Sequence, residues 1–479
     1  MIVCGDNKVM TSHLIVVGAG LAGLSAAYRG LELGLRVTVL ERATEEPHPC
    51  ASRANSGIFH AAFRSLKVDP DDLLKAIRTA NDGFGRPDVA HALAYNAKRG
   101  VDWLQSLGVE FAPAEQDADW KDLKLAPSGF SDKPDLAWQG LGADRMLTTL
   151  ERQAIKSGAR IDRGARVHEL LFEAGRVCGV RTTMGSGEDI VRGDAVVLTD
   201  GGFEGNRELV RRHITAHPEH LMMRGLSSGL GDGILMAEAA GAQLVGMQSF
   251  YGHLLSADSL NQDGLSPFPF LDFLASAGML VDQTGKRFMD ESLGGVRMAN
   301  GLAAHDNGLG WVVFDHAMWE GIGRHFFRPP NPNLVNAGGT LHRCETLESL
   351  AGLLAVPHRH LQDGIRAVNA EAATNANVAS ANPTSPGPSQ HHRFEHAPYY
   401  AAPVCAGLTS TLGGIEIDAS GHVLDHSGQF IPGLYAAGNS TGGVEGGPSV
   451  GYVGGLIKAL VFGLLCAEEI ARSSSPRSR

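Results

Sequence analysis

A nucleotide-binding fingerprint near the start of the chain constrains the fold more than any other segment. Residues 14–42 read LIVVGAGLAGLSAAYRGLELGLRVTVLER, where an apolar strand runs into Gly18, Gly20 and Gly23, and a helical segment leads to a second strand ending in Glu41. The three glycines permit a tight turn, close approach of the backbone to a pyrophosphate, and close packing of helix on strand. The segment therefore predicts a strand–helix–strand unit that binds a dinucleotide.

The same segment indicates how the dinucleotide is held. The N-terminus of the predicted helix offers free N–H groups and a positive dipole end to phosphates. The Glu41 carboxylate can accept hydrogen bonds from a ribose diol. The place of the fingerprint near the N-terminus favours FAD over NAD, and the sequence contains no second fingerprint for NAD.

Composition and charge narrow the class of protein. The 479 residues include 61 glycines, where average usage of roughly 7% gives about 34, and this excess fits a fold with many tight turns. The length suffices for two or more domains. The net charge of −11 argues against nucleic acid or an anionic membrane as the main partner.

The cysteines and the apolar segments support further expectations. Six scattered cysteines include no C-x-x-C pair, which predicts a reducing compartment and neither a disulfide framework nor a metal site. Since no haem or iron–sulfur motif occurs, we expect a separate electron donor or acceptor. No signal peptide and no long apolar span is visible, which predicts a cytoplasmic protein without a transmembrane segment.

Hydrophobic periodicity places further elements along the chain. The predicted elements are helices within 70–111 and 143–158, strands at 165–171, 176–184 and 189–198, and a last helix at about 454–471. The composition changes near His253, and strand-like patterns return near Leu412. This change predicts an inserted region between two parts of one nucleotide-binding domain.

A series of sequence blocks carries a resemblance to a known family. The blocks are VVGAGLAGLSAA, the Asn55-Ser56 loop, VVLTDGGFEGN, GLGDGILMAEAAGAQL, GMLVDQTGKRFMDE, TLGGIEID and IPGLYAAGNSTGGVEGG. In this order they resemble the flavoprotein family of fumarate reductases, succinate dehydrogenase flavoprotein subunits and 3-ketosteroid dehydrogenases, and the chain is also similar to tricarballylate dehydrogenase. The resemblance implies an α/β fold with a discontinuous Rossmann-like FAD-binding domain (1–251 and 411–479) and an inserted α+β capping domain (252–410).

The resemblance also implies a set of cofactor-binding residues. These are Gly18, Gly20, Leu21, Ala22, Gly23, Glu41, Arg42, Asn55, Ser56, Val167, Asp200, Gly201, Gly438, Asn439, Gly454, Gly455 and Leu456. Asn55 occupies the position where succinate dehydrogenases carry a flavin-linked histidine, which implies non-covalent FAD. An ordinary loop turn is the alternative for Asn55 and Ser56. Asn439 replaces the family's usual glutamate, and Asp200 stands where the family usually has threonine.

The family reaction exchanges a hydride between flavin N5 and a carbon next to an activating carbonyl or carboxylate, while a proton moves at the neighbouring carbon. Fumarate reductases use arginine and histidine to grip a dicarboxylate. Here those three positions fall at Trp319, Ser410 and Tyr452. The loss of these basic residues argues against fumarate reduction, and Tyr452 resembles the steroid and tricarballylate dehydrogenase pattern.

Five residues are candidates for catalysis on this resemblance: Tyr452, Tyr251, His253, Arg297 and Arg324. A phenol can donate a hydrogen bond to an enolate oxygen without placing a cation in the pocket. An aromatic ring packed on the flavin edge is the alternative for Tyr452. Glu291 and Arg297 follow the GKRFMDE block, where reductases place a proton-relay acid and an arginine, and a surface or interdomain ion pair is the favoured alternative for them.

Three functions follow as hypotheses. The first is an FAD-dependent dehydrogenase or reductase of a C–C bond beside the carbonyl of a ketone, plausibly a steroid-like one. The second is a di- or tricarboxylate dehydrogenase or soluble fumarate-reductase-type enzyme, with arginines recruited from Arg64, Arg224, Arg297 or Arg324. The third, of another class, is a flavin electron-transfer or assembly subunit without its own substrate.

Overall fold

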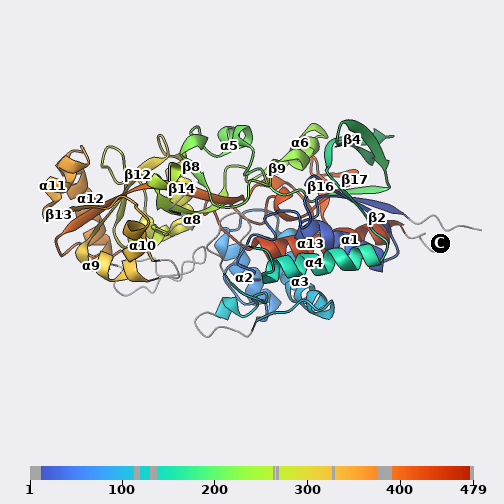
Figure 1. Ribbon diagram of the computed structural model, residues 1–479, viewed down its shortest axis with the longest axis horizontal. Helices are drawn as coiled ribbons and strands as arrows, with labels where there is room; N and C mark the ends of the chain where they lie inside the picture. Colours follow the sequence, from blue (N-terminus) through green and yellow to red (C-terminus); the bar gives the residue numbers. More distant parts are fainter. Residues whose placement is uncertain are drawn as a thin grey trace, which may run out of the picture.

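The computed structural model describes residues 12–112, 119–129, 138–262, 265, 269–325, 329–374 and 391–474. These residues form an elongated molecule with two lobes (Figure 1). One lobe holds the parallel sheet and the long helices around it. The other lobe is built on a second sheet, and the long strand β14 (Tyr399–Thr411) runs from it toward the first lobe.

A six-stranded sheet forms the centre of the first lobe. Its order is β16 (His422–Leu424), β17 (Phe430–Ala436), β7 (Ala195–Leu198), β1 (His13–Val17), β2 (Arg36–Glu41) and β3 (Arg160–Arg163). Strand β1 lies between two parallel partners and is buried along its whole length, as the continuous apolar run requires. The strand–helix–strand prediction is confirmed, and segments far apart in the sequence share one sheet.

Helices pack on one another beside this sheet. They are α1 (Leu21–Glu32), α2 (Pro70–Ala80), α3 (Pro87–Ser106), α4 (Gly142–Lys156) and α13 (Gly455–Ser474). Small residues let α1 and α13 approach closely, since a Cβ on Gly463 would lie 2.5 Å from the Ala22 carbonyl oxygen. The helical segment predicted within 70–111 is two helices, α2 and α3, and each has a proline in its first turn.

An antiparallel three-stranded sheet contacts the parallel sheet through β5. It consists of β4 (Ala165–Glu173), β5 (Arg176–Met184) and β6 (Gly187–Arg192). The single strand predicted at 189–198 was wrong, because β6 ends at Arg192 and β7 begins at Ala195 in the other sheet. Gly193 makes this crossing possible, since a Cβ there would lie 2.8 Å from the Ile15 side chain.

The second lobe is built around β14. Its sheet has the order β10 (Phe250–Ser256), β14, β12 (Leu309–Asp315) and β11 (Met279–Asp282), with β8 (Leu221–Met223) and β13 (His342–Cys344) also paired to β14. Its helices are α7 (Asp272–Ala277), α8 (Gly295–Ala304), α9 (His316–Glu320), α10 (Pro330–Asn336), α11 (Leu347–Leu353) and α12 (His358–Thr374).

Short elements join the two lobes. They are α5 (Arg207–His213), α6 (Asp232–Ala239), and the paired strands β9 (Leu244–Val245) and β15 (Gly414–Ile415). The first residue of β10 pairs with Thr411 at the end of β14, so both strands meet the first lobe together. The α/β fold class is confirmed, and the exact domain division at 251/252 and 410/411 stays a prediction.

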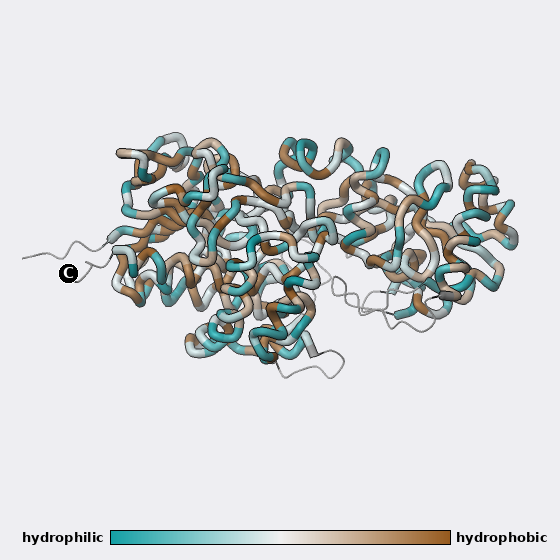
Figure 2. The backbone as a smooth tube through the Cα atoms, turned by 180° about the vertical axis from the view of Figure 1, so that it is seen from behind, coloured by the Kyte–Doolittle hydropathy of each residue, from teal (hydrophilic) through white to brown (hydrophobic). Residues whose placement is uncertain are grey.

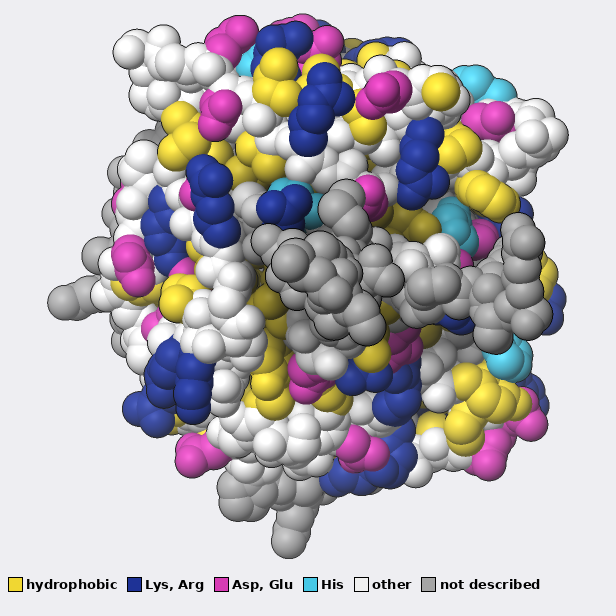
Figure 3. Space-filling view, turned by 90° about the vertical axis from the view of Figure 1, so that its right-hand side faces the viewer, with side chains coloured by type: hydrophobic (Ala, Val, Ile, Leu, Met, Phe, Trp, Pro, Cys, Tyr) yellow, Lys and Arg dark blue, Asp and Glu magenta, His cyan; other side chains and the backbone are white. Residues whose placement is uncertain are grey.

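The surface follows the usual distribution of polarity. Apolar segments gather in the strands and inner helices, and hydrophilic ones lie outside (Figure 2). On the face in Figure 3, basic and acidic side chains are interspersed among scattered apolar ones. Among the described residues, no helix combines the length and apolarity that crossing a bilayer would need.

Candidate active site

The fingerprint glycines hold the turn between β1 and α1 against the end of β7. Gly18 has a φ of +97°, and a Cβ there would lie 2.7 Å from the Thr199 carbonyl oxygen. A Cβ on Gly23 would lie only 1.9 Å from the Gly18 carbonyl oxygen. Larger residues would push α1 away from the sheet, so these glycines position the helix N-terminus.

The acid at the end of β2 braces this turn. The Glu41 carboxylate accepts the Ala19 N–H (2.8 Å) with one oxygen and the Ala43 N–H (2.8 Å) with the other. Each oxygen has a second lone pair for a ribose hydroxyl. The Ser52 hydroxyl accepts the Leu21 N–H at 3.1 Å, a contact that our sequence analysis did not predict.

Loops after β7 and β17 meet the fingerprint at the switch point of the sheet, where strand order reverses. A Cβ on Gly438 would lie 3.0 Å from the Ala22 Cβ. The Ser440 hydroxyl accepts the Gly201 N–H (3.1 Å) and lies 3.3 Å from the Asp200 carboxylate. In doubly wound sheets, dinucleotides bind at this point. We call residues 18–23, Glu41, Asp200–Gly201 and Gly438–Ser440 the nucleotide cradle.

Asp200, the unexplained departure from the family pattern, has a local role. Its carboxylate accepts the Gly233 N–H at 2.8 Å and so caps the first turn of α6. Burial raises the pKa of Asp200 to about 6. The acid therefore fixes α6 beside the nucleotide cradle.

The other predicted cofactor residues lie on separate elements. Asn55 Oδ1 accepts the Gly57 N–H (2.7 Å), and the Asn55 side-chain NH2 donates to the Ser52 carbonyl oxygen, so this side chain is hydrogen-bonded within its own loop. Ser56 is exposed in that loop. Arg42 donates to the Ser228 carbonyl at 2.7 Å. Val167 is buried on β4 opposite Thr182, and binding roles for these residues stay predictions.

The N-terminus of α13 connects the nucleotide cradle to a second cluster. A Cβ on Gly455 would lie 3.7 Å from the Asn439 side-chain oxygen. The Gly455 N–H donates to the Tyr452 hydroxyl at 3.3 Å. Gly454 precedes the helix with a φ of +145°, and Leu456 lies in its first turn. Predicted cofactor and catalytic residues thus share one helix end.

Aromatic rings gather around Tyr452. We call this cluster the aromatic site, and its members are His60, Phe63, Trp120, Tyr251, His253, Phe270 and Tyr452. The Tyr251 and Tyr452 rings stack with centroids 4.0 Å apart, and the His60 ring meets Tyr452 edge-on at 5.8 Å. Three predicted catalytic residues, Tyr251, His253 and Tyr452, are therefore brought together.

A hydrogen-bonded chain leads from Tyr251 to a buried acid. The Tyr251 hydroxyl lies 3.2 Å from His253 Nε2, and His253 Nδ1 lies 2.8 Å from an Asp272 carboxylate oxygen. The other Asp272 oxygen accepts the Leu254 N–H. Because the carboxylate accepts the Nδ1 proton, Nε2 is left to accept from Tyr251. Burial lowers the pKa of His253 and raises that of Tyr251.

Asp272 is a residue that our sequence analysis missed. It begins α7, nineteen residues after His253, and no spacing rule joins an acid to a histidine across such a gap. The preceding Pro-Phe segment gave only a composition signal. Tertiary packing of α7 against β10 creates this contact.

A β-bulge aims the side chains at this point. The β10–β14 register shifts between Tyr251, opposite Ser410, and Gly252, opposite Leu408, which leaves Thr409 unpaired. The Thr409 hydroxyl accepts from Arg224 at 2.5 Å. Bulges of this kind re-aim side chains beside active sites.

Arg224 brings a buried cation to the aromatic site. Its guanidinium carbon lies 4.6 Å from the Phe270 ring centroid, and that ring stacks on His253 at 4.4 Å. Burial lowers the pKa of Arg224. From the sequence, this arginine is predicted only as one of several alternatives that could bind a substrate carboxylate.

The loop that carries Tyr452 has a constrained backbone. Val450 has a φ of +46°, and in the neighbouring loop Ala62 and Phe63, whose ring contacts Tyr452, have φ of +50° and +52°. The Ala62 N–H donates to the Val453 carbonyl at 2.6 Å, which joins the two loops. Left-handed residues other than glycine carry strain that often collects at functional sites.

A buried ion pair holds the end of the same loop. Lys458 Nζ lies 2.5 Å from one Glu445 oxygen, and the other accepts the N–H groups of Val453 (2.9 Å) and Gly454 (2.8 Å). Both side chains are 1% exposed. No sequence pattern predicts this ion pair, which holds the start of α13 in place.

The remaining predicted catalytic residues are arginines outside this cluster. Arg297 on α8 donates to the Ser449 carbonyl at 2.7 Å, near the Tyr452 loop. Arg324 forms a half-exposed ion pair with Glu320 at 2.7 Å. Their catalytic roles stay predictions.

Two further positions of the resemblance lie in the second lobe. Glu291 is fully buried, and Arg287 donates to it at 2.7 Å. The acid therefore forms an ion pair, but a buried one within the second lobe, whereas a surface or interdomain pair was predicted. Trp319, where fumarate reductases have an arginine, packs on Phe314 and Tyr400 in the core. This position is therefore structural in the present chain.

Comparison with known proteins assigns the cofactor. A family model described as "FAD binding domain" matches residues 13–451. The chain is 24% identical to a fumarate reductase (cytochrome) of Shewanella frigidimarina, over 97% of this chain and 78% of that protein. It is 26% identical to 4-oxocyclohexanecarboxylate 2-dehydrogenase of Sinomonas cyclohexanicum, over 96% of this chain and 93% of that protein.

Solved structures share the fold. A 3-ketosteroid-Δ4-(5α)-dehydrogenase from Rhodococcus jostii RHA1 matches with a TM-score of 0.71 and 21% identity, over 98% of this chain and 99% of that one. A flavocytochrome c3 fumarate reductase matches with a TM-score of 0.66 and 21% identity, over 97% and 79%. The chain thus belongs to the FAD-binding domain family and is an FAD-dependent oxidoreductase of the fumarate reductase and 3-ketosteroid dehydrogenase type.

Proposed function

We propose that this enzyme dehydrogenates or reduces a C–C bond beside the carbonyl of a bulky, uncharged cyclic ketone. The observation that carries the proposal is the stacked pair Tyr251 and Tyr452, with centroids 4.0 Å apart. The two phenols are backed by different partners, a helix N-terminus for Tyr452 and His253 for Tyr251. This asymmetry suits two separate tasks, polarising a carbonyl and moving a proton.

Tyr452 is the group that polarises the carbonyl. Burial raises its pKa well above the ordinary value, so it stays a phenol that can donate. The Gly455 N–H points at its oxygen from the N-terminus of α13, where the dipole is positive. This contact strengthens the hydroxyl as a donor to a ketone or enolate oxygen.

Tyr251 is the group that moves the proton. In dehydrogenation its oxygen takes a proton from the substrate carbon while its own proton passes to His253 Nε2, 3.2 Å away. Asp272 then stabilises the imidazolium through Nδ1. Reduction runs the same transfers in reverse. FAD, when bound, supplies the hydride acceptor or donor.

The nucleotide cradle fits FAD bound without a covalent link. The glycine turn leaves room for a pyrophosphate, and Glu41 keeps a lone pair on each oxygen. The Asn55 amide is bonded within its own loop and is no nucleophile. Electrons leave or enter through a separate partner.

Arg224 supports a second candidate, a substrate that bears a carboxylate. Its guanidinium lies over the Phe270 ring, which stacks on His253 in the aromatic site. Arg64 is exposed, and Arg324 is paired with Glu320. A ketone that also carries a carboxylate, as the Sinomonas relative's name describes, would use Arg224 and both tyrosines together.

The test is anaerobic reduction of the bound flavin by substrate. We expect a 3-oxosteroid to bleach the flavin, and succinate to leave it oxidised. Bleaching by 4-oxocyclohexanecarboxylate and not by the steroid would favour the second candidate. Tyr452→Phe and Tyr251→Phe should each slow bleaching by roughly 10²–10⁴-fold, the usual contribution of a positioned acid or base. Tyr95→Phe is the matched control, because Tyr95 is an exposed residue of α3 whose hydroxyl donates to the Asp71 carboxylate.

Other outcomes would decide against the ketone. Rapid reoxidation of reduced flavin by fumarate, with both ketones inactive, would favour the dicarboxylate enzyme. A flavin unresponsive to ketones and to di- and tricarboxylates would favour an electron-transfer or assembly subunit.

A further inference from the structure

Three side chains that take no part in the site described above project from one turn between α5 and β8. His217, Glu219 and His220 belong to the sequence His-Pro-Glu-His, and residues 218–220 form a single 3-10 turn. One ligand atom from each lies within 4.8 Å of the others. We propose that these three residues bind a divalent transition metal such as Zn²⁺.

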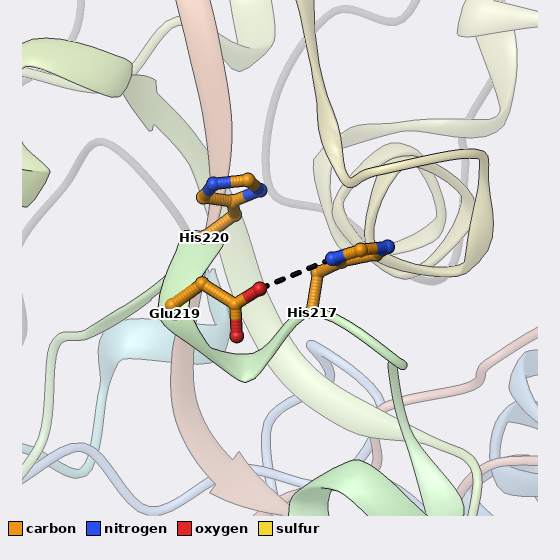
Figure 4. A group of neighbouring side chains, drawn as sticks. All are labelled: His217, Glu219 and His220. Atoms are coloured by element: carbon orange, nitrogen blue, oxygen red, sulfur yellow. Dashed lines mark hydrogen bonds and ion pairs between the residues drawn. The ribbon is translucent and has the colours of Figure 1, made fainter.

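The turn explains why the two histidines face the same way. In a 3-10 turn, residues three apart in the sequence are eclipsed, and the His220 N–H donates to the His217 carbonyl at 3.0 Å. The two imidazole rings are accordingly near parallel, with an angle of 14° and centroids 5.7 Å apart. Figure 4 shows the three side chains around a common space.

Hydrogen bonds set the rings for metal binding. The Asn307 carbonyl oxygen lies 2.7 Å from His220 Nδ1 and can only accept, so Nδ1 carries the proton and Nε2 keeps a lone pair. Metal-binding histidines commonly donate their other ring nitrogen to a carbonyl in this way. His217 Nδ1 lies 3.1 Å from a Glu219 oxygen, where a cation would replace the shared proton.

Two similar groups in the described part of the chain are less suited to a metal. In the group of Asp282, His305 and Asp306, one Asp282 oxygen already accepts the Thr284 and Lys286 N–H groups. In the group of Asp290, Glu371 and His391, Arg287 already neutralises Glu371. Among the described residues, no arginine or lysine forms an ion pair with Glu219, and the His217 and Glu219 side chains are 40% and 47% exposed.

The donor set favours a transition metal over calcium or magnesium. Imidazole suits zinc, copper, iron and nickel, while calcium and magnesium prefer oxygen ligands. Two imidazoles and one carboxylate leave a fourth position of a tetrahedral zinc site to water. The expectation of no metal site was based on the spacing of the cysteines, and cysteine spacing does not bear on a site made of histidines.

A bound metal would also join two parts of the molecule. The turn leads directly into β8, which pairs with β14, and His220 is bonded to Asn307 in the loop between α8 and β12. A ligand that binds only the folded state raises the melting temperature. Zn²⁺ should therefore stabilise the junction beside the second lobe.

The experiment is titration of the metal-free, flavin-loaded enzyme with Zn²⁺ alone, followed by calorimetry and by thermal melting. We expect one Zn²⁺ per chain and a rise in melting temperature. His217→Ala and His220→Ala should each weaken binding by more than the roughly 10–100-fold that loss of a second-shell partner costs. Glu219→Gln should weaken Zn²⁺ binding less than the two alanine variants. Because it changes one side-chain atom, it remains a usable test if an alanine variant does not fold.

His396→Ala is the matched control, because His396 is an exposed histidine whose ring, among the described residues, forms an ion pair only with Glu395 at 3.9 Å. It should bind Zn²⁺ like the wild type. Absence of stoichiometric binding to the wild type would overturn the proposal, as would equal binding by correctly folded His217→Ala and His220→Ala. Unchanged flavin content and unchanged melting in chelator establish folding of each variant.

Discussion

The nucleotide cradle and the aromatic site use different parts of the chain's chemistry. The nucleotide cradle depends on backbone N–H groups and glycines, most of them within one segment of 29 residues, 14–42. The aromatic site depends on side chains from segments hundreds of residues apart, such as His60, Tyr251 and Tyr452. A backbone site tolerates little change in packing, whereas a side-chain site can change substrate while the fold persists.

The largest effect that we expect is from Gly23→Ala in the nucleotide cradle. The new Cβ would lie 1.9 Å from the Gly18 carbonyl oxygen, so α1 must move and its N-terminus no longer meets the phosphates. Nearly all bound flavin should be lost, as measured by the ratio of flavin to protein absorbance after gel filtration. Gly352→Ala on α11, with nothing within 4 Å, is the control, and full flavin retention by Gly23→Ala would contradict this account.

Loss of the buried ion pair should be the next largest effect. Lys458→Met leaves the Glu445 charge buried without its cation, which typically costs about 3–5 kcal/mol in the free energy of unfolding. Denaturant unfolding measures it, and Lys98→Ala in an exposed pair with Asp102 should cost at most about 1 kcal/mol. The double variant Glu445→Gln/Lys458→Met should recover part of the lost free energy of unfolding, because it no longer buries an unpaired charge. If it recovers none, the buried Glu445 charge is not the cause of the loss.

The two regions should respond to pH in opposite directions. Burial lowers the pKa of His60 to about 4, so the unfolded chain binds more protons and stability falls as pH drops from 6.5 toward 4. Burial raises the pKa of Asp200 to about 6, so stability falls as pH rises from 3.8 toward 6. Each effect amounts to about 3 kcal/mol at most.

Melting temperatures of two variants across pH 4–8 measure these effects. His60→Gln should lose less stability in acid than the wild type, and Asp200→Asn should gain stability relative to the wild type at pH 7. Each variant is the control for the other. Parallel pH curves for the wild type and both variants would show that neither group titrates as burial implies.

Within the aromatic site, Asp272 should act through His253. In Asp272→Asn a single oxygen remains for two donors; when it accepts the Leu254 N–H, the amide NH2 faces Nδ1 and can no longer accept its proton, so we expect turnover to fall roughly 10²-fold with a shifted pH profile. Combining it with Tyr251→Phe should cost little more than the worse single variant, since residues that act as a unit are not additive. An unshifted pH profile with additive losses would make Asp272 purely structural.

The smallest effect should come from Arg324→Gln. Its exposed ion pair with Glu320 is worth about 0–1 kcal/mol, and we expect turnover close to that of the wild type. Steady-state kinetics with the compound that reduces the flavin in the test under Proposed function measure the change. A large loss of turnover would instead support the catalytic role that the family resemblance predicts for this arginine.

Much of the first lobe could be predicted, because local rules apply there. The spacing of Gly18, Gly20, Gly23 and Glu41 specifies a turn, a helix and an acid that remain neighbours in the fold. The strand at 189–198 was mispredicted for the opposite reason. An apolar run cannot show that the chain leaves one sheet for another at Gly193. A glycine is needed there only because the folded chain passes close to Ile15 on β1, and this contact is not visible in the sequence.

The aromatic site could be predicted only in part. The family resemblance named Tyr251, His253 and Tyr452, but nothing in the sequence links them to Asp272 or places the Arg224 guanidinium over Phe270. Those contacts depend on the β10–β14 register and its bulge at Thr409. A slip of one residue would turn every side chain of the strand to the other face.

The sequence by itself determined the cofactor and the family, because FAD recognition relies on backbone geometry that neighbouring glycines encode. Tertiary structure alone decided which group is hydrogen-bonded to each tyrosine hydroxyl, and it brought His220 to the Asn307 carbonyl oxygen. The physical reason is the range of the forces. Turn and helix geometry act between neighbours in the chain, while hydrogen bonds and ring contacts between distant residues exist only after the sheets have packed.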